Sequence, residues 1–321
     1  MIMTKTLKLA LFLVLTYGVV PLALGGDQYV IGLIVASLTI GGIAIAWALL
    51  GNLGGMVSFG HAAFFGVGAY VSALLTMRAG WPVFPAMLAA GVGAAIASVA
   101  TMPALRLRGP YFALAILAYA EIFRILATEL KSVTGGAAGL LSIPRLPIIL
   151  GLDFGTKLGG YFVILTLVVL AMGGYHLIRR SPHGLALKAM HDSEDATRVV
   201  GVNSTMLKAA MLAVSAFITG MVGAFNAHYI NFLEPDYAFA GQWTTLAIVS
   251  AIFGGYRTVT GPLLGAVAVY LVDQLLFKAI LPQGHQIVLG VLLGAMILFS
   301  PGGLMPMVLG RFSRKEAVHA A

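Results

Sequence analysis

Ten apolar segments separated by short polar stretches account for most of the chain. Each is close to the length a helix needs to cross the hydrocarbon core of a bilayer. They span residues 7–25, 30–50, 57–77, 83–104, 111–128, 160–178, 208–230, 243–256, 260–281 and 286–308. The pattern predicts an all-α integral membrane protein, a polytopic bundle of about 8–10 transmembrane helices. We expect residues 1–321 to form a single transmembrane domain.

Three segments depart from a simple span. Segment 243–256 is short, so we expect it to be broken or tilted. Segment 57–77 opens with Ser58, Gly60 and His61, which predicts an irregular start. Lys5 and Lys8 are followed by the apolar run Leu9–Leu24, which fits a signal peptide as well as a span. We favour a retained span, because many more spans follow it.

The stretch between residues 179 and 208 is the most polar in the chain. Asp192 is suited to cap a helix start, Glu194 and Asp195 suit its first turn, and Gly201 suits its end. The pattern therefore predicts short helices outside the membrane. They form either a docking surface for another protein or a solvated connection, because caps stabilise any short helix.

Charge predicts which side of the membrane each loop faces. With the N terminus inside and every segment crossing, thirteen basic residues fall inside and five outside, in agreement with the positive-inside rule. The inside set is Lys5, Lys8, Arg106, Arg108, Arg179, Arg180, Lys188, Arg198, Lys208, Arg257, Arg311, Arg314 and Lys315. The outside set is Arg78, Lys131, Arg145, Lys157 and Lys278. Loop 179–208 and both termini are then cytosolic, and loop 129–159 is external.

Composition supports the same class of protein. Hydrophobic residues make up 60% of the chain and charged residues 9%, against about 25% charged in soluble domains. The 40 glycines suit close packing of transmembrane helices, as do the pairs Gly261–Gly265 and Gly290–Gly294. The net charge of +8 follows the loops as expected for a membrane protein, so we do not expect a nucleic-acid partner.

Few polar groups lie at membrane depth. Glu121 and Arg124 are three residues apart, and we expect a structural ion pair rather than a solute site. His61 has no acidic or histidine neighbour in sequence, so a satisfied polar residue is favoured over a metal ligand, and no metal site is predicted.

Four polar side chains are candidates for lining a transport pathway: Asn52, Ser58, His61 and Asn226. Glycines and polar residues in the stretch 52–61 allow irregular backbone next to water or protein. Tight helix packing around Gly54, Gly55 and Gly60 explains the same pattern equally well.

Motifs for catalysis are missing. The chain has no G-x-x-x-x-G-K-[ST] phosphate loop, no H-E-x-x-H, no G-x-S-x-G and no cysteine. We therefore expect a transport protein rather than an enzyme, with no cofactor of its own. A pore, a secondary transporter and the membrane subunit of a pump driven by another protein remain, and the polar loop 179–208 favours the last.

Several motifs, in order, resemble those of branched-chain amino acid ABC transporter permeases of the LivM type. Residues 52–70 read NLGGMVSFGHAAFFGVGAY, 107–113 read LRGPYFA, 134–140 read TGGAAGL, and 299–304 read FSPGGL. Residues 253–255 (FGG) with Gly261-Pro262 add a further match. Three departures stand out: Ala138 replaces a common Asp, Gly184-Leu185 replaces Gly-Arg, and Arg257-Thr258 replaces Gly-Ser.

The resemblance implies a permease in a bacterial cytoplasmic membrane that moves branched-chain amino acids, or a similar small polar solute, inward. It implies a second homologous permease, two cytosolic ATPase subunits that bind the ATP, and an external solute-binding protein, all in contact with membrane lipid. The residues it assigns to ATPase coupling are Gly184, Leu185, Ala189, Met190, Asp192, Glu194, Asp195 and Gly201. One alternative is the permease of a urea or amide ABC importer. The other is a self-contained, ion-coupled secondary transporter with a solute site near the membrane midplane.

Overall fold

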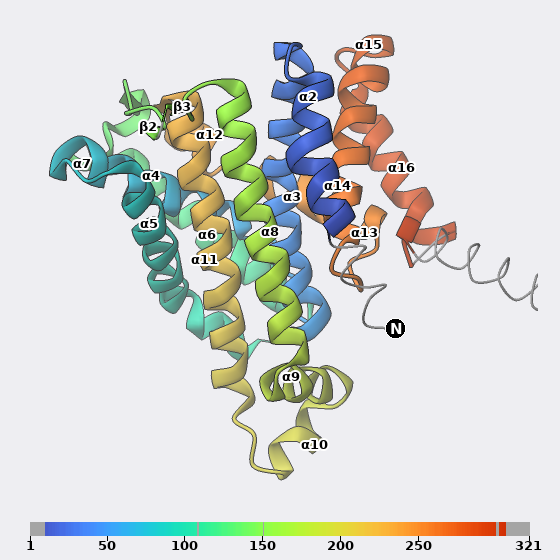
Figure 1. The fold of residues 1–321 in the computed structure, drawn as a ribbon. Helices are drawn as coiled ribbons and strands as arrows, with labels where there is room; N and C mark the ends of the chain where they lie inside the picture. Colours follow the sequence, from blue (N-terminus) through green and yellow to red (C-terminus); the bar gives the residue numbers. More distant parts are fainter. Residues whose placement is uncertain (1–9, 108, 150, 300–301, 306–321) are drawn as a thin grey trace, which may run out of the picture.

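Long apolar helices run side by side between the two ends of the molecule (Figure 1). The computed structural model describes residues 10–107, 109–149, 151–299 and 302–305. Within this part of the chain, seven helical segments are long and apolar enough to cross a bilayer. They are α3 (Gln28–Gly54), α4 (His61–Ala79), α5 (Val83–Ala97) with a 3-10 continuation (Ser98–Arg106), α6 (Pro110–Glu129), α8 (Lys157–Arg180), α11 (Ser204–Ile230), and α14 (Gly261–Val272) with a π-helical turn (Asp273–Phe277) and α15 (Lys278–Ile280).

Shorter apolar helices occupy the remaining predicted segments. They are Ala10–Leu24, which includes a π-helical turn (Leu15–Val19) and α2 (Val20–Leu24), then α13 (Gly241–Gly254) and α16 (His285–Phe299). Every predicted apolar segment therefore contains a helix, which confirms the all-α class. Residues 1–9 and 306–321, which carry the predicted cytosolic charges of both termini, lie outside the described residues.

An irregular connection, Gly55–Gly60, joins α3 to α4, as predicted for the start of segment 57–77. Gly55 ends α3 in the left-handed conformation, with φ of 64°, and the Met56 amide returns to the Leu50 carbonyl at 3.4 Å. A glycine in the left-handed conformation at the end of a helix is a common C-cap. The chain then continues without regular structure to Gly60, the N-cap of α4.

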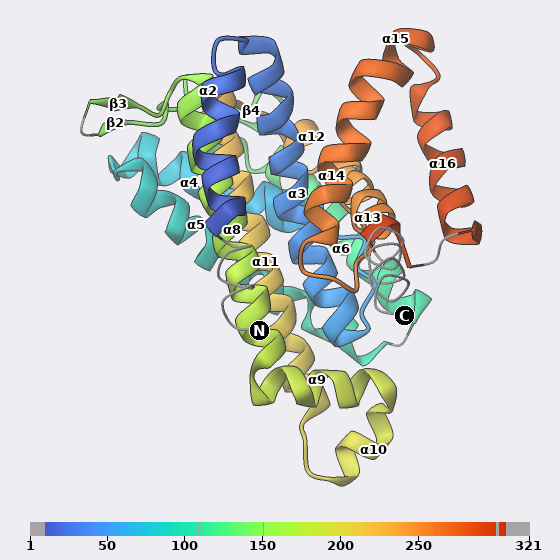
Figure 2. The ribbon, with the colours of Figure 1, turned by 45° about the vertical axis from the view of Figure 1, so that its right-hand side comes forward.

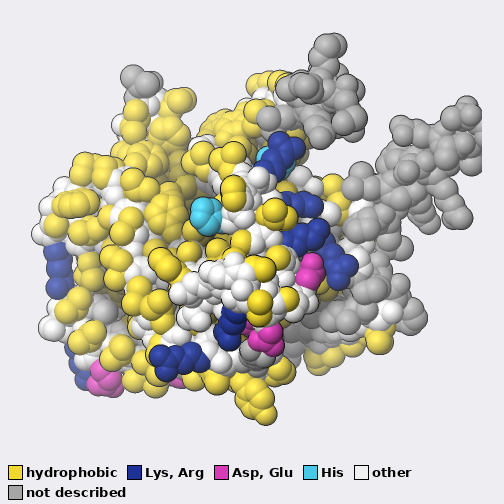
Figure 3. Space-filling model, turned by 90° about the horizontal axis from the view of Figure 1, so that it is seen from below, with side chains coloured by type: hydrophobic (Ala, Val, Ile, Leu, Met, Phe, Trp, Pro, Cys, Tyr) yellow, Lys and Arg dark blue, Asp and Glu magenta, His cyan; other side chains and the backbone are white. Residues whose placement is uncertain are grey.

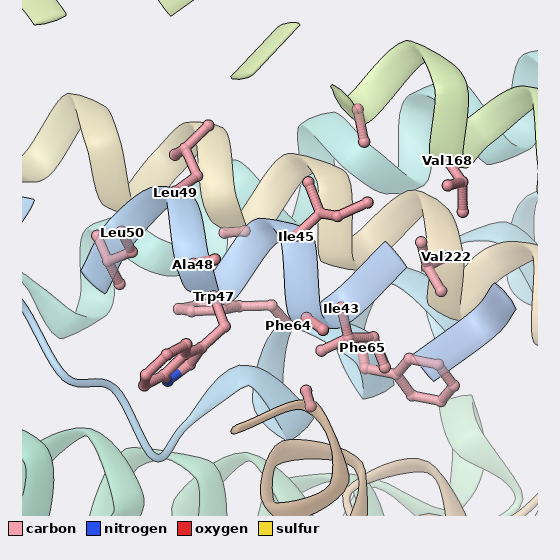
Figure 4. Close-up of a cluster of buried hydrophobic side chains, with 14 of the residues drawn as sticks. Ile43, Ile45, Trp47, Ala48, Leu49, Leu50, Phe64, Phe65, Val168 and Val222 are labelled. Carbon is pink, nitrogen blue, oxygen red and sulfur yellow. The ribbon is translucent and has the colours of Figure 1, made fainter. Parts of the chain in front are cut away.

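Helix α3 is almost wholly enclosed, and α8, α11, α13 and α14 pack around it (Figures 1 and 2). Figure 4 shows the core beside it, where side chains of α3 meet Phe64 and Phe65 of α4 and Val222 of α11. Lipid tails are as apolar as the side chains, so the hydrophobic effect does little to drive helices together inside a bilayer. Close packing of small residues has to hold the helices together instead.

Small-residue stripes make the closest helix contacts. A Cβ on Gly220 of α11 would overlap Ala94 of α5, and one on Gly265 of α14 would overlap the Ser250 carbonyl of α13. The second contact confirms packing at the predicted pair Gly261–Gly265. Gly290 and Gly294 of α16 have no neighbour within 4 Å of a Cβ among the described residues, so that stripe makes no helix contact there.

The polar connections gather at opposite ends of the bundle (Figures 1 and 2). One end, here the α7 end, carries α7 (Lys131–Thr134), a 3-10 turn (Gly136–Ala138), β1 (Leu140–Leu141), β2 (Ile148–Ile149), β3 (Leu152–Asp153), β4 (Phe232–Leu233) and α12 (Pro235–Ala238). Two antiparallel pairs form there, β1 with β4 in the register Leu140 to Leu233, and β2 with β3. The other end, here the α9 end, carries α9 (Pro182–Asp192) and α10 (Glu194–Val199).

Candidate coupling and translocation site

Two capped helices project from the α9 end. The Ser181 hydroxyl accepts from the Gly184 amide at 3.1 Å and starts α9. The Ser193 hydroxyl accepts from the Ala196 amide at 3.3 Å and starts α10. The predicted cap at Asp192 is therefore wrong by one residue, because Ser193 has the extended backbone of a cap and Asp192 is still helical.

The other predicted signals around α10 are confirmed. Glu194 and Asp195 lie in its first turn, where carboxylates suit the helix dipole. Gly201 follows its last turn with φ of 88°, a conformation that glycine adopts without strain.

Glu194 fastens α10 to the base of α11. Its carboxylate accepts from Lys208 Nζ at 2.8 Å and from Arg198 at 2.8 Å. Arg198 Nε also donates to the Ser204 hydroxyl at 2.8 Å. Burial opposes ionisation of Glu194, but the hydrogen bond and charge of Lys208 outweigh it and hold the Glu194 pKa below its usual value. We call Glu194, Arg198 and Lys208 the α10 clasp.

The predicted coupling residues divide between surface and interior. Leu185 and Ala189 are exposed, whereas Met190 is buried and Gly184 packs against the end of α8. Val199 and Val200, which sequence reasoning missed, are 88% and 77% exposed. Figure 3 views this end of the molecule, where hydrophobic side chains stand beside lysine and arginine. The arrangement offers an apolar surface on a rigidly joined element.

Helix α9 also touches the irregular connection between α3 and α4. A Cβ on Gly55 would overlap Nδ1 of His191, so these residues are in direct contact. A cavity of about 710 Å³ lies beside the contact, lined by Gly55–Val57, Phe59, the start of α6 and residues 190–194. A displacement of α9 therefore reaches this connection directly, and the connection has room to move.

Three of the four pathway candidates are buried and hydrogen-bonded. His61 Nε2 lies 2.9 Å from the Ser215 hydroxyl, which donates to the Ala46 carbonyl. The Ser58 hydroxyl accepts from the Gly60 amide at 3.3 Å, and Asn226 accepts from the Tyr237 hydroxyl at 2.9 Å. This placement is the one expected for the packing interpretation, although His61 Nδ1 is buried without a hydrogen-bond partner.

Asn52 differs from the other three candidates. It donates to the Tyr175 hydroxyl at 2.6 Å and to the Arg257 carbonyl at 3.3 Å, and it lines a hollow at the α9 end. Asn226 lies near the end of α11 (Ser204–Ile230), far from the start of that helix at the α9 end. The structure therefore does not bring the four candidates together. Among the residues that the structure describes, no three potential metal ligands gather.

The Glu121–Arg124 pair forms, but within a larger cluster. Arg124 contacts Glu121 at 2.5 Å and also Asp236 of α12 at 2.7 Å. In this single chain the side chain of Glu121 is 55% exposed, that of Arg124 32% and that of Asp236 79%. Glu121 lies eight residues before the end of α6, about 12 Å along the helix axis. Exposed charges on an apolar helix favour contact with water or another protein over contact with lipid.

Sequence reasoning missed the partners that lie far along the chain. Asp236 is separated from Arg124 by 112 residues, and Lys208 from Glu194 by 14. The one sequence signal for Asp236 and Lys208 is that each is a charged residue beside an apolar segment.

The comparison with protein families decides the classification. The family described as branched-chain amino acid transport system, permease component, matches residues 9–300. The chain belongs to this family of permeases.

Curated relatives agree with that placement. The permease protein LivM of the high-affinity branched-chain amino acid transport system of Salmonella typhimurium is 32% identical over 292 residues, covering 83% of this chain and 67% of the relative. Its Escherichia coli counterpart is 30% identical with the same coverage. A probable branched-chain amino acid transport permease, LivM, of Methanocaldococcus jannaschii is 23% identical over 68% of this chain. No solved structure matches the chain.

Proposed function

We propose that this permease is the membrane subunit of an ABC importer that carries branched-chain amino acids inward, powered by separate ATPase subunits. The observation that carries the proposal is the α9–α10 element. It is capped at both helix starts, clasped to α11 through Lys208, and in contact with the α3–α4 connection through His191. A motor bound there would push on a capped element that touches the irregular α3–α4 connection.

The same geometry supports the proposed partners. Leu185, Val199 and Val200 offer apolar contact to a cytosolic ATPase. The charged face of α6 suits a second, homologous permease, because protein or a water-filled path between two subunits would cover charges that lipid would not. An external binding protein would dock on the opposite, α7 end.

The distribution of basic residues supports an orientation in the membrane. We place the α9 end, with its arginines and lysines, in the cytosol of a bacterium whose cytoplasmic membrane holds the protein. Both termini are then cytosolic. No ATP binds to this chain in the proposal, because hydrolysis belongs to the partner subunits.

Reconstitution tests the proposal. The permease, a homologous permease, the two ATPases and the binding protein are placed in vesicles with ATP inside, and uptake of labelled leucine, isoleucine, valine, urea and acetamide is measured. We expect ATP-dependent uptake of the branched-chain amino acids only. Preference for urea or acetamide would replace the proposed solute, and uptake that persists with inactive ATPases would indicate a secondary transporter.

A further inference from the structure

Four basic side chains face one hollow at the α9 end of the bundle. The hollow has a volume of about 960 Å³ and lies between the end of α3, the end of α8, α9 and the α13–α14 connection. Its cations are Arg179, Arg180, Lys188 and Arg257. Among the described residues that line it, Asp192 supplies the one carboxylate.

These cations differ from the other basic groups near them. Arg198 and Lys208 each pair with Glu194 at 2.8 Å. Within the described part of the chain, none of the four cations of the hollow makes an ion pair. Like charges around one hollow repel each other, so an anion with several oxygens placed among them would lower the electrostatic energy.

The hollow lies at the level of a membrane surface. Arg179 and Arg180 are the last two residues of α8, a 24-residue apolar helix that is long enough to cross a bilayer. Arg257 lies between α13 and α14, which are both apolar. Basic side chains directly after a membrane span lie where the headgroups of anionic lipids gather.

Helix α8 also carries an exposed apolar face along the turns that precede Arg180. Leu170, Gly173, Leu177 and Arg180 recur at helical spacing on one face. Leu170 and Leu177 are 64% and 71% exposed. A Cβ at Gly173 would have no neighbour within 4 Å, so this face has open space beside it. A ligand with an anionic head and a hydrocarbon chain matches both parts.

We propose that this hollow binds the phosphate-bearing headgroup of an anionic phospholipid, with an acyl chain lying along the Leu170–Leu177 face of α8. Arg179, Arg180, Lys188 and Arg257 bind the phosphate oxygens. The inference goes beyond the proposed function, because it does not depend on the solute, although Gly184, Leu185 and Asp192 of the proposed coupling surface also line the hollow.

Binding to the purified full chain in detergent tests the site. Native mass spectrometry measures retention of phosphatidylglycerol and of phosphatidylcholine with the same acyl chains. We expect clear preference for phosphatidylglycerol. The double variant Arg180→Gln/Arg257→Gln should weaken phosphatidylglycerol binding roughly thirtyfold, given the usual contribution of each basic residue near an anionic surface. The charge-preserving variant Arg180→Lys/Arg257→Lys should retain most of it.

A matched variant, Arg106→Gln/Lys131→Gln, removes two exposed charges outside the hollow and should leave the preference unchanged. Equal binding of both lipids, or full preference in the Arg180→Gln/Arg257→Gln variant, would refute the site. Displacement of the lipid by millimolar inorganic phosphate would identify a free-anion site instead. If the double variant lost only ATPase association and kept its lipid preference, the hollow would be a protein contact and the lipid proposal would fall.

Discussion

Gly55 is the residue on which the contact between α9 and the α3–α4 connection depends. Its φ of 64° suits glycine, and its missing Cβ leaves room for His191. Gly55→Ala should therefore lose about 1–2 kcal/mol of stability to backbone strain, and more to the overlap with His191. A lower Tm of the purified protein and weaker ATP-coupled uptake are the expected readouts.

Gly80 supplies a matched control, because it caps α4 with φ of 65° and its Cβ would meet no atom within 4 Å. Gly80→Ala should lower the Tm by the backbone strain alone and leave ATP-coupled uptake unchanged. Combining Gly55→Ala with His191→Ala should raise the Tm back to the Gly80→Ala level. Equal effects of Gly55→Ala with and without His191 would show that the contact plays no part.

Residue identity indicates backbone conformation more directly than it indicates contacts. Gly135, Gly136 and Gly139 of the TGGAAGL stretch all have positive φ, as a run of glycines favours. The contact of Gly55 with His191 joins residues far apart in the chain, and local pattern carries no information about such pairs. His61 shows the same limit, since its bond to Ser215 spans 154 residues.

Among the elements, α10 is held by a clasp that one substitution opens. Glu194→Gln removes the charge shared by Lys208 and Arg198, and we expect a loss of about 1.5–3 kcal/mol of local stability, the usual contribution of hydrogen bonds to charged groups. Limited proteolysis between Val199 and Asn203 should become faster, and ATPase stimulation by the permease should fall. The double variant Glu194→Lys/Lys208→Glu restores opposite charges and should recover part of both. Unchanged proteolysis in Glu194→Gln would mean that the clasp does not hold α10.

The clasp also predicts a pH dependence. The folded-state pKa of Glu194 lies below its ordinary value of 4.5, so its contribution is fully present above about pH 4.5 and is lost as the pH falls through the folded-state pKa. Hydrogen exchange of the α10 amides, corrected for intrinsic rates, should therefore accelerate on acidification through this range. Lys208→Met should reduce that dependence, and a variant with the same pH profile as the original chain would contradict the assignment.

At the level of elements, periodicity and length were sufficient to predict the helices. Each of the ten apolar runs became a helix because a span must satisfy its own backbone hydrogen bonds. The α10 cap was misplaced by one residue because Asp192 and Ser193 are both good caps, and only packing of α9 decides between them. Gly290 and Gly294 meet no neighbouring helix among the described residues. Small residues in a sequence therefore indicate where a helix contact can form, but not which helix forms it.

For the whole molecule, the Glu121–Arg124–Asp236 cluster predicts how the chain assembles. Glu121→Gln leaves Arg124 paired with Asp236, so we expect co-purification with the second permease to change less than about twofold. Arg124→Gln leaves two carboxylates without their cation on a face that assembly would enclose. Co-purification and uptake should then fall at least about tenfold. If Arg124→Gln assembled normally, the α6 face would border open water rather than a subunit.

The shortness of α13 affects how the membrane voltage is distributed across the protein. Its 14 residues extend about 21 Å, against a hydrocarbon core of about 30 Å. The connection after it, with Arg257, borders the hollow at the α9 end, so polar groups stand where the apolar part of a full span would continue. The electric potential therefore drops over a shorter distance here, and the local field is steeper. A zwitterionic amino acid carries no net charge and crosses without electrical work, but its dipole would be turned by that field as it passes.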